Sequence, residues 1–303
     1  MTFKIWTLPE CSSCLMKISY DIIEKSIKNE SLKLKLFQKI FKILENFDSK
    51  SLTFDLANKI FMEIENNSEI YDPYLEIKKI SNSISIGIIE KIKDLIVDIL
   101  ENNSFESFKK CLIMALVGNI IDFATGGHEF DLNEEYLSSL INESLDKDLI
   151  IDDSEHIYDI VKSGKKKIIY CLDNAGEIVF DKILIEKLIK LNNQVVAVVK
   201  NKPYSNDALI EDAIDVNLTK ICKVIITERF GLGFINNDAS EEFLNELNSC
   251  DMIISKGQNN FETFTFYREK FNKKIVFLLI SKCKPLSKFL NTSLRSFIAK
   301  LEI

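Results

Sequence analysis

KKIIYCLDNAGE, residues 166–177, joins an apolar run to a group of polar side chains, and this junction decides how the chain folds. Asp173 and Asn174 follow the apolar run and lead into a turn that contains Gly176. Strand ends of this kind carry the chemistry of many α/β proteins. Side-chain oxygens at a strand end can bind a cation, and glycine lets the backbone turn without steric cost. The segment therefore predicts a buried strand followed by half of a metal site.

A second apolar run, QVVAVVK at 194–200, leads in the same way into Asn206 and Asp207. Because the carboxyl ends of neighbouring parallel strands meet at one edge of a sheet, two acidic strand ends can converge on one ion. Asp and Asn side chains also cap helices, so Asp173 or Asn174 could instead satisfy the free N–H groups of the next helix. The presence of two such strand ends favours the metal site.

From Lys165 onward, short β-branched runs alternate with amphipathic segments of helical length. This alternation favours a parallel sheet with helices on both faces. We therefore expect residues 161–303 to form a parallel-sheet α/β/α (Rossmann-like) domain that holds the metal site. The five predicted strands are KKIIYCL, QVVAVVK, CKVIITE, DMIISKG and KKIVFLLISK.

Residues 1–160 are expected to form an all-helical subdomain that begins with a CxxC motif at Cys11 and Cys14. Apolar residues recur here at the three- and four-residue spacing of helices, and polar breaks such as FDSKS and ENNSFES separate them. The helical pattern continues to about Ser154. The two parts are predicted to pack directly on each other, since no flexible linker joins them.

The composition excludes several classes of function. The formal charge of −7 gives no general attraction to nucleic acid or to anionic membranes, so a small-molecule substrate is expected. No apolar run has the length of a membrane span, and the first residues lack the pattern of a secretory signal. Seven cysteines, an odd number scattered over 303 residues, argue for reduced thiols. The protein is expected to be cytoplasmic.

The predicted strand DMIISKG ends at Lys256 and Gly257, and helical spacing resumes after Asn260. A lysine beside a helix amino terminus suits phosphate, because its charge and the free N–H groups point to the same place. The alternative is a solvated lysine beside a helix cap. Neither a GxxxxGK[ST] loop nor a GxGxxG motif is present, so the sequence does not support nucleotide binding through those devices.

Short motifs spread along most of the chain resemble those of the damage-control phosphatase family, in particular its stand-alone, largely archaeal subfamily marked by an N-terminal CxxC. Each motif is weak alone, but together they stand in the order that the family has. They are Cys11 and Cys14; Asp72-Pro73-Tyr74 with Lys78; Gly118-Asn119 with Asp122; Asp173 to Glu177; Asn206-Asp207; Ser255 to Gln258 with Asn260; and Lys282-Cys283.

The resemblance implies a divalent cation (Mn, Mg, Co or Ni) held by Asp173, Asn174 and Asp207. These residues and Lys256 form the implied catalytic set. The substrate pocket implied by the resemblance consists of Asn119, Asp122, Glu177, Asn206, Lys256 and Asn260. The chain departs from the family pattern after Arg295-Ser-Phe-Ile, where a Gly-rich final strand is expected and absent.

The leading hypothesis is a metal-dependent phosphatase that hydrolyses phosphomonoesters of small metabolites, such as damaged or surplus sugar phosphates or cofactor intermediates. One alternative is a carboxyl methyltransferase that uses S-adenosylmethionine, although no Gly-rich loop follows the first predicted strand. Another is a metal or redox binding module centred on Cys11 and Cys14. No second CxxC is present to complete a four-ligand zinc site.

Overall fold

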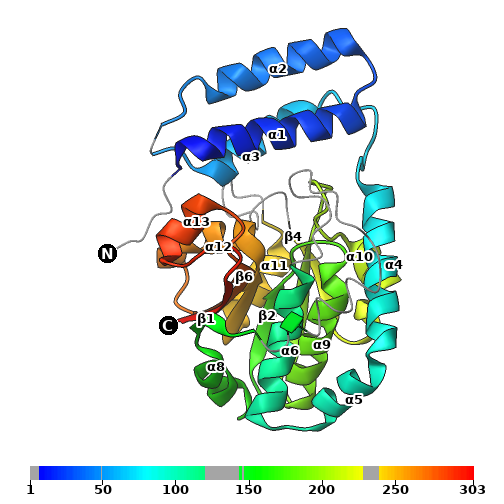
Figure 1. Ribbon diagram of the computed structural model, residues 1–303, viewed down its shortest axis with the longest axis vertical. Helices are drawn as coiled ribbons and strands as arrows, with labels where there is room; N and C mark the ends of the chain where they lie inside the picture. The colour runs from blue at the N-terminus through cyan, green and yellow to red at the C-terminus, as the bar shows by residue number, and fades with distance from the viewer. Residues whose placement is uncertain (1–6, 49, 120–142, 145–146, 228–238) are drawn as a thin grey trace.

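A seven-stranded sheet lies at the centre of the computed structural model, between two layers of helices and beneath a cap of three helices (Figure 1). The structure describes residues 7–48, 50–119, 143–144, 147–227 and 239–303. The strands are β1 (Leu149–Asp152), β2 (Lys167–Cys171), β3 (Gln194–Lys200), β4 (Lys223–Thr227), β5 (Met252–Lys256), β6 (Lys274–Ile280) and β7 (Phe297–Glu302).

The strand order is β1-β7-β6-β5-β2-β3-β4, which makes β1 and β4 the edges of the sheet. Strands β2 to β6 are parallel, whereas β7 runs antiparallel to β6 and parallel to β1. From β2 the chain proceeds outward to β3 and β4 and then returns to β5 on the other side of β2. Sheets of this type bind ligands at the point where the strand order reverses, outside the carboxyl ends of the strands. Here that point lies between β2 and β5.

Two hydrophobic clusters lie on opposite faces of the sheet, because the side chains of each strand alternate between the faces. The first contains residues of α4 (Leu75–Lys91), α5 (Lys93–Glu101), α6 (Phe105–Gly118), α8 (Ser154–Val161), α9 (Glu177–Lys190) and α10 (Ile210–Asp215). The second contains residues of α11 (Glu241–Ser249), α12 (Gly257–Phe266) and α13 (Lys284–Leu290). Short 3-10 turns form η1 (Leu218–Lys220) and η2 (Arg268–Lys270). No helix in the described part of the chain is both long and apolar enough to cross a membrane.

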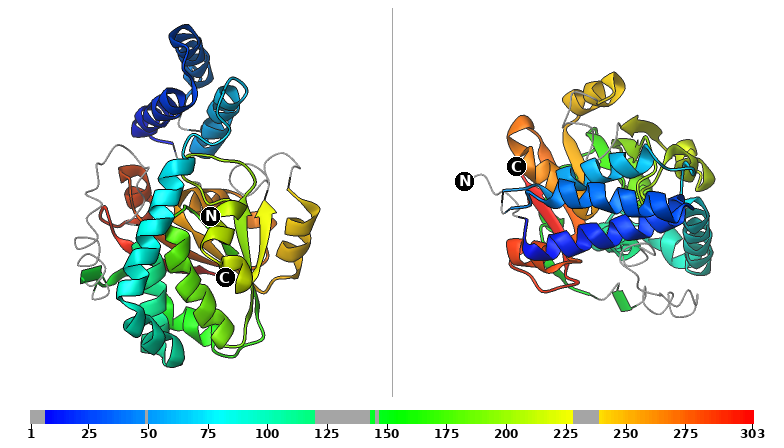
Figure 2. Two further views of the ribbon diagram at one scale, coloured as in Figure 1. Left: turned by 90° about the vertical axis from the view of Figure 1, so that its right-hand side faces the viewer. Right: turned by 90° about the horizontal axis from the view of Figure 1, so that it is seen from above.

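The cap consists of α1 (Pro9–Ser26), α2 (Glu30–Leu44) and α3 (Thr53–Glu65), and two further views show it above the sheet (Figure 2). It has a hydrophobic cluster of its own, which includes Leu36 and Ile40 of α2. Asn29 caps α2, because its side chain accepts a hydrogen bond from the backbone N–H of Leu32 at 3.0 Å.

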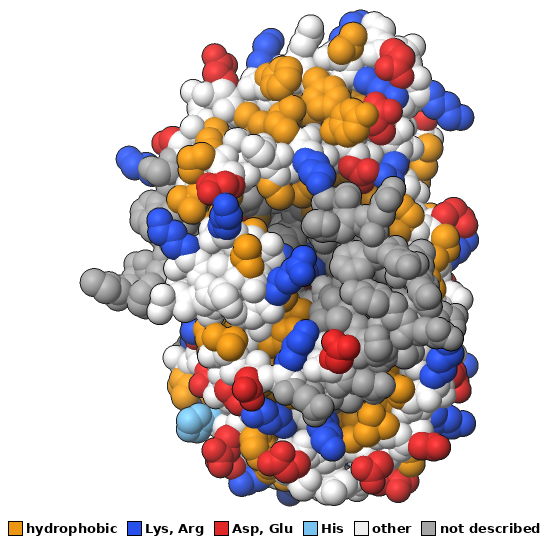
Figure 3. Space-filling view, in the orientation of Figure 1, with side chains coloured by type: hydrophobic (Ala, Val, Ile, Leu, Met, Phe, Trp, Pro, Cys, Tyr) orange, Lys and Arg blue, Asp and Glu red, His pale blue; other side chains and the backbone are white. Residues whose placement is uncertain are grey.

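Apolar side chains also gather on the outer face of the cap (Figure 3). The exposed fractions are 57% for Tyr20, 67% for Leu34 and 57% for Phe41. Phe37 lies between Tyr20 and Phe41, with tilted rings whose centroids are 6.3 and 6.4 Å from its own. The cap therefore buries one apolar stripe inside and leaves a smaller one exposed.

The predicted fold class is confirmed: a mostly parallel α/β sheet follows an N-terminal helical region. All five predicted strands are present as β2 to β6. The prediction that the chain is helical to about Ser154 is wrong for Leu149–Asp152, which pairs with the final strand as β1. The chain also has a final strand, β7, although it contains no glycine.

Both missed strands lie toward one edge of the sheet. β1 has only four residues, and β7 carries Lys300 and Glu302 in its second half, so neither has the long apolar run by which a central parallel strand is recognised. The division of the chain at residue 160 stays a prediction. The hydrophobic clusters separate nearer to Tyr74, because α4 to α6 pack with the sheet rather than with the cap.

Buried charges join α4 to α10. Lys78 is 1% exposed, and its Nζ lies 2.8 Å from Asp72 Oδ2 and 3.1 Å from Asp212 Oδ2. The Asn82 side chain donates to the other oxygen of Asp212 at 2.9 Å. Removing the lysine would leave two buried carboxylates without their cation.

We expect Lys78→Met to reduce the free energy of unfolding by about 3–5 kcal/mol, the usual effect of breaking a buried ion pair from one side. Urea denaturation at neutral pH measures this loss. The matched control is Lys79→Met, since Lys79 is the exposed neighbour on the same helix. If the free energy of unfolding fell no more in the Lys78 variant than in the control, the stabilising role given to Lys78 with Asp72 and Asp212 would be contradicted.

Glu262 of α12 lies where the cap meets the sheet domain, beside Thr53 and Phe54 at the start of α3. Burial raises the pKa of Glu262 from its ordinary value of 4.5 to about 7, although a hydrogen bond from Gln258 Nε2 at 2.9 Å opposes the rise. A carboxyl whose pKa is higher in the folded state favours folding when it is protonated.

We therefore expect Glu262 to lower the free energy of unfolding as the pH rises from about 4.5 to about 7, where it ionises in the folded protein. Glu262→Gln should flatten the pH dependence of stability over this window. Thermal or urea unfolding at several pH values measures it, with the exposed Glu269→Gln as control. Identical profiles for the parent and Glu262→Gln would contradict the shifted pKa.

Candidate metal and phosphate site

The loops that follow β2 and β3 are joined by backbone hydrogen bonds. Asn174 and Asp207 form an isolated antiparallel bridge. On either side of it, Ala208 N–H donates to Asp173 O and Ala175 N–H donates to Asn206 O, each at 2.9 Å. The structure thus brings together the two acidic strand ends that the sequence placed 33 positions apart, at the carboxyl edge of the sheet.

The side chains of the predicted ligand set are nearly buried, with exposed fractions of 8% for Asp173, 6% for Asn174 and 7% for Asp207. Asn174 Nδ2 donates to Asp173 Oδ2 at 3.2 Å and to Glu177 Oε1 at 2.7 Å. These bonds fix the orientation of the amide, so Oδ1 is the atom that Asn174 can offer to a cation.

Gly257 makes room for the Asp173 carboxylate at the start of α12. A Cβ atom on Gly257 would lie 1.8 Å from Asp173 Oδ2, a distance that no pair of non-bonded atoms can adopt. The φ angle of Gly257 is +77°, a conformation that side chains other than glycine rarely take. The carboxylate therefore lies against the amino terminus of α12, where the helix dipole favours negative charge.

Glu177 is the first residue of α9 and is fully buried. Its carboxylate accepts hydrogen bonds from Asn174 Nδ2 and Asn119 Nδ2, and Lys256 Nζ lies 3.6 Å from Oε2. Hydrogen bonds and a positive charge from the protein itself therefore satisfy this carboxylate. Substrate binding by Glu177 and Asn119 stays a prediction; the contacts described give both residues a positioning role.

Lys256 is also fully buried, and its ammonium contacts groups of α6 and α9. Nζ lies 2.7 Å from Asp181 Oδ1 and donates to Ala115 O at 2.8 Å. Burial alone would lower the pKa of Lys256, but the charges of Asp181 and Glu177 raise it, so the ammonium stays charged. Lys256 holds α6, α9 and β5 together in this arrangement.

Two further residues of the predicted pocket also bond to the protein. Asn260 Nδ2 donates to Leu172 O at 3.0 Å and to Lys256 O at 2.8 Å. Asn206 is buried, and the Ser205 hydroxyl donates to its Oδ1 at 3.3 Å. The predicted pocket residue Asp122 lies outside the described residues.

Sequence reasoning missed the residue that holds the turn after β2. Asn82 of α4 accepts a hydrogen bond from the backbone N–H of Gly176 at 2.7 Å, and it donates to Asp212. Gly176 has a φ of +80°, and a Cβ there would approach Ser81 Cβ to 3.0 Å. No local pattern marks Asn82, because its partners lie 94 and 130 positions away.

Cys11 is buried in the first turn of α1, and Cys14 is exposed. Burial raises the pKa of Cys283, and the nearby Glu262 and Cys11 add to the rise.

Within the described residues, no group of three or more His, Cys, Asp or Glu side chains is arranged to hold a metal ion. The predicted set at the sheet edge contains two carboxylates and one amide.

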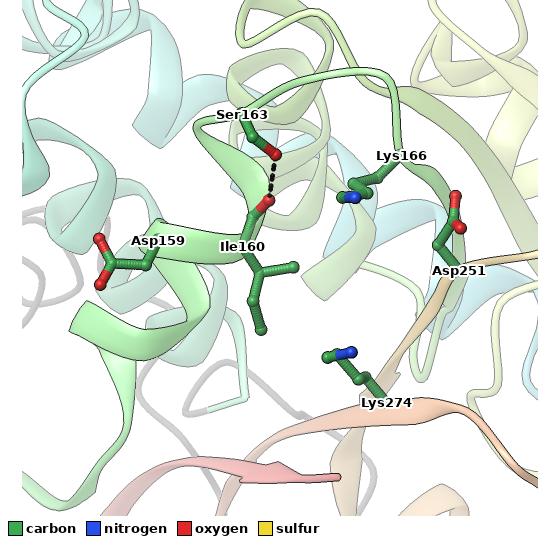
Figure 4. A pocket seen from close by; sticks show the side chains of 6 residues that line it. All are labelled: Asp159, Ile160, Ser163, Lys166, Asp251 and Lys274. Atoms are coloured by element: carbon green, nitrogen blue, oxygen red, sulfur yellow. Dashed lines mark hydrogen bonds between the residues drawn. The ribbon is translucent and has the colours of Figure 1, made fainter.

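A separate surface cavity of about 240 Å³ lies at the opposite edge of the sheet (Figure 4). Lys166 and Asp251 in its wall stand just before β2 and β5, so the cavity opens at the amino ends of the parallel strands. This end of the sheet lies opposite the loops after β2 and β3, where Asn174 and Asp207 form their bridge. The candidate metal site therefore lies at the carboxyl ends of the parallel strands and not at this cavity.

The model of the damage-control phosphatase ARMT1-like domain matches residues 7–296 of the chain.

The chain belongs to this family.

Damage-control phosphatases of two archaea are similar over nearly the whole length. The one from Archaeoglobus fulgidus is 30% identical over 295 residues, which cover 97% of this chain and 98% of that protein. The one from Pyrococcus horikoshii is 31% identical and covers 92% of both chains. An uncharacterised protein of Methanocaldococcus jannaschii is 34% identical over 92% of this chain and 90% of its own length.

The crystal structure of a DUF89 family protein from Pyrococcus horikoshii has the same fold, with a TM-score of 0.81 and 29% sequence identity. The match covers 97% of this chain and 98% of that one. Membership of the damage-control phosphatase family supports an enzyme of the phosphatase type. The narrower assignment to a CxxC subfamily stays a prediction.

The residues of this family member fit a divalent cation. Asp173 and Asp207 carry carboxylate oxygens, and Asn174, whose Nδ2 donates to Asp173 and Glu177, carries Oδ1 as a third oxygen. Because Gly257 has no side chain, the Asp173 carboxylate can lie against its backbone. Oxygen ligands of this kind suit magnesium, manganese and similar ions.

We expect Gly257→Ala to weaken Mn²⁺ binding by roughly tenfold or more, because the new methyl group displaces the Asp173 carboxylate. The measurement is a Mn²⁺ titration followed by electron paramagnetic resonance. Gly164→Ala is the matched control, since Gly164 also has a positive φ of +67° but packs against Leu191 and Asn192. Both variants should lose stability. Equal Mn²⁺ affinities in the two would contradict the role given to Gly257 in placing the Asp173 carboxylate.

Proposed function

We propose that this protein is a divalent-metal-dependent phosphatase that hydrolyses phosphomonoesters of small metabolites. The observation that carries the proposal is the bridge between Asn174 and Asp207, which joins the acidic loops after β2 and β3. These loops lie beside the point, between β2 and β5, where the strand order reverses. Family membership and the names of the archaeal relatives support the same reaction class.

Asp173, Asn174 and Asp207 would hold the cation. When bound, the ion supplies Lewis-acid polarisation of a phosphoryl oxygen and neutralises charge that develops on it. Manganese, magnesium, cobalt and nickel are the candidates, because each accepts oxygen ligands. These assignments are a proposal that rests on the chemistry of the donor set.

The residues around the ligand set orient it. Glu177 fixes the amide of Asn174, and Lys256 holds Glu177 and Asp181 in place through buried charge. Asn82 holds the turn at Gly176. Such preorganisation favours catalysis, because the groups that meet the transition state need not reorganise when it forms.

The substrates proposed are damaged or surplus sugar phosphates or cofactor intermediates, and the proposed location is the cytoplasm. The net charge of −7 favours a small ligand over nucleic acid. The methyltransferase and the cysteine-centred module stay predictions, and no contact of the described residues favours either over the phosphatase.

We expect release of phosphate from a panel of phosphomonoesters to require added Mn²⁺, Co²⁺, Ni²⁺ or Mg²⁺. Asp173→Ala and Asp207→Ala should each reduce kcat/KM by at least roughly 100-fold, because each removes a charged oxygen ligand. Asp159→Ala is the control, since Asp159 lines the cavity at the opposite edge of the sheet. Metal-independent turnover, or unchanged turnover in either ligand variant, would contradict the proposal.

A further inference from the structure

Lys200 is the last residue of β3 and is 4% exposed. Its backbone N–H donates to Ala208 O at 3.1 Å, and Ala208 N–H in turn donates to Asp173 O at 2.9 Å. Asp207 is the residue next to Ala208. Lys200 is therefore tied by backbone hydrogen bonds to both loops of the candidate metal site.

The side chain of Lys200 lies on the face of the sheet that α12 covers. Val196 and Val198 belong to the cluster beneath α11, α12 and α13, and the two-residue period of a strand puts Lys200 on the same face. Lys200 Nζ donates to Asn260 Oδ1, and Asn260 Nδ2 donates to the carbonyl of Leu172, the residue that follows β2. The ammonium therefore lies close to the carboxyl end of β2, where Asp173 follows.

Lys200 has few partners for a buried cation. Its Nζ donates to Asn260 Oδ1 at 3.4 Å, a long contact, and no carboxylate of the described residues forms an ion pair with it. Lys256, by contrast, points to the other face and is paired with Asp181 at 2.7 Å. An ammonium removed from water and left with one weak acceptor is unfavourable, and an anion beside it relieves the cost.

Asn260 holds the lysine from the first turns of α12. Both of its described donor contacts go to backbone carbonyls, those of Leu172 and Lys256. The amide is therefore fixed between the ends of β2 and β5, and this orientation turns Oδ1 toward Lys200. Asn260 thus positions Lys200 at the edge of the sheet where the strand order reverses.

We propose that Lys200 binds the phosphoryl group of the substrate and that Asn260 is its positioning residue. The proposal rests on the proposed phosphatase function and deepens it, because it names the cation that recognises the phosphate dianion. An ammonium with unused hydrogen-bond donors suits a ligand rich in acceptor oxygens. Lys256, the lysine that the sequence predicted for this role, lies on the opposite face of the sheet, where it pairs with Asp181 and Glu177.

The experiment measures the affinity for inorganic phosphate by calorimetry on the magnesium-loaded protein, together with kcat/KM on the best phosphomonoester. Lys200→Met keeps most of the apolar part of the side chain and removes its charge, so we expect phosphate affinity to fall roughly 10- to 100-fold, the range of one charge-assisted hydrogen bond. Lys200→Arg should recover part of it. Magnesium affinity should stay equal or increase, because a positive charge near the ion is lost.

The matched control is Lys202→Met. Lys202 lies two positions further along the chain, and its Nζ is paired with Glu65 of the cap at 3.0 Å. We expect phosphate affinity and kcat/KM of this variant to match the parent. Thermal unfolding checks that all variants are folded.

Asn260→Asp provides a second test that keeps the lysine. A carboxylate in place of the amide oxygen pairs with Lys200, so phosphate affinity should fall although the cation is still present. Parent-like phosphate affinity in both Lys200→Met and Asn260→Asp would overturn the role of Lys200 and leave the phosphatase intact. A parent protein that neither hydrolyses phosphomonoesters nor binds phosphate would overturn both proposals together.

Discussion

The groups around the candidate site meet at the buried carboxylate of Glu177. It accepts hydrogen bonds from Asn119 at the end of α6 and from Asn174 in the loop after β2, and Lys256 of β5 lies beside it. Its place in the first turn of α9 adds the favourable field of a helix amino terminus. A buried charge is tolerated in a protein interior only when it is paired and hydrogen-bonded, and here those partners come from three separate elements. The requirement to satisfy one carboxylate therefore fixes the relative positions of α6, α9 and the loop after β2 that carries Asp173 and Asn174, here called the ligand loop.

A second buried network connects this centre to the cap side of the molecule. Lys78 and Asn82 of α4 both reach Asp212 of α10, and Asn82 also holds Gly176 of the ligand loop. Since Tyr74, just before α4, packs into the cap cluster, the helix that orients the ligand loop also begins in the cap. The shape of the site is thus coupled to the packing of residues far from it.

The sequence predicted the parts of the site that obey a local rule. Polar residues at the end of an apolar run gave Asp173, Asn174 and Asp207, because strand ends of a parallel sheet gather at one edge. The same rule applies to Lys200 at the end of QVVAVVK, but its importance emerges only when its partners are known. The direction of Lys256 depends on which face of β5 it occupies, and Asn82 acts through contacts with residues distant in sequence. The strand β1 was missed because four residues at a sheet edge carry too weak a pattern.

The order of the strands also protects the molecule from its own most apolar segments. Strands such as β3 and β6 would offer unpaired backbone groups to another chain if they lay at an edge, but both are interior. One edge is β1, which is only four residues long. The other is β4, where Lys223 forms ion pairs with Glu242 and Glu246 of α11. A short strand at one margin and a charged one at the other make the sheet a poor template for edge-to-edge aggregation, and the hydrophobic strands that shape the site stay out of reach of other chains.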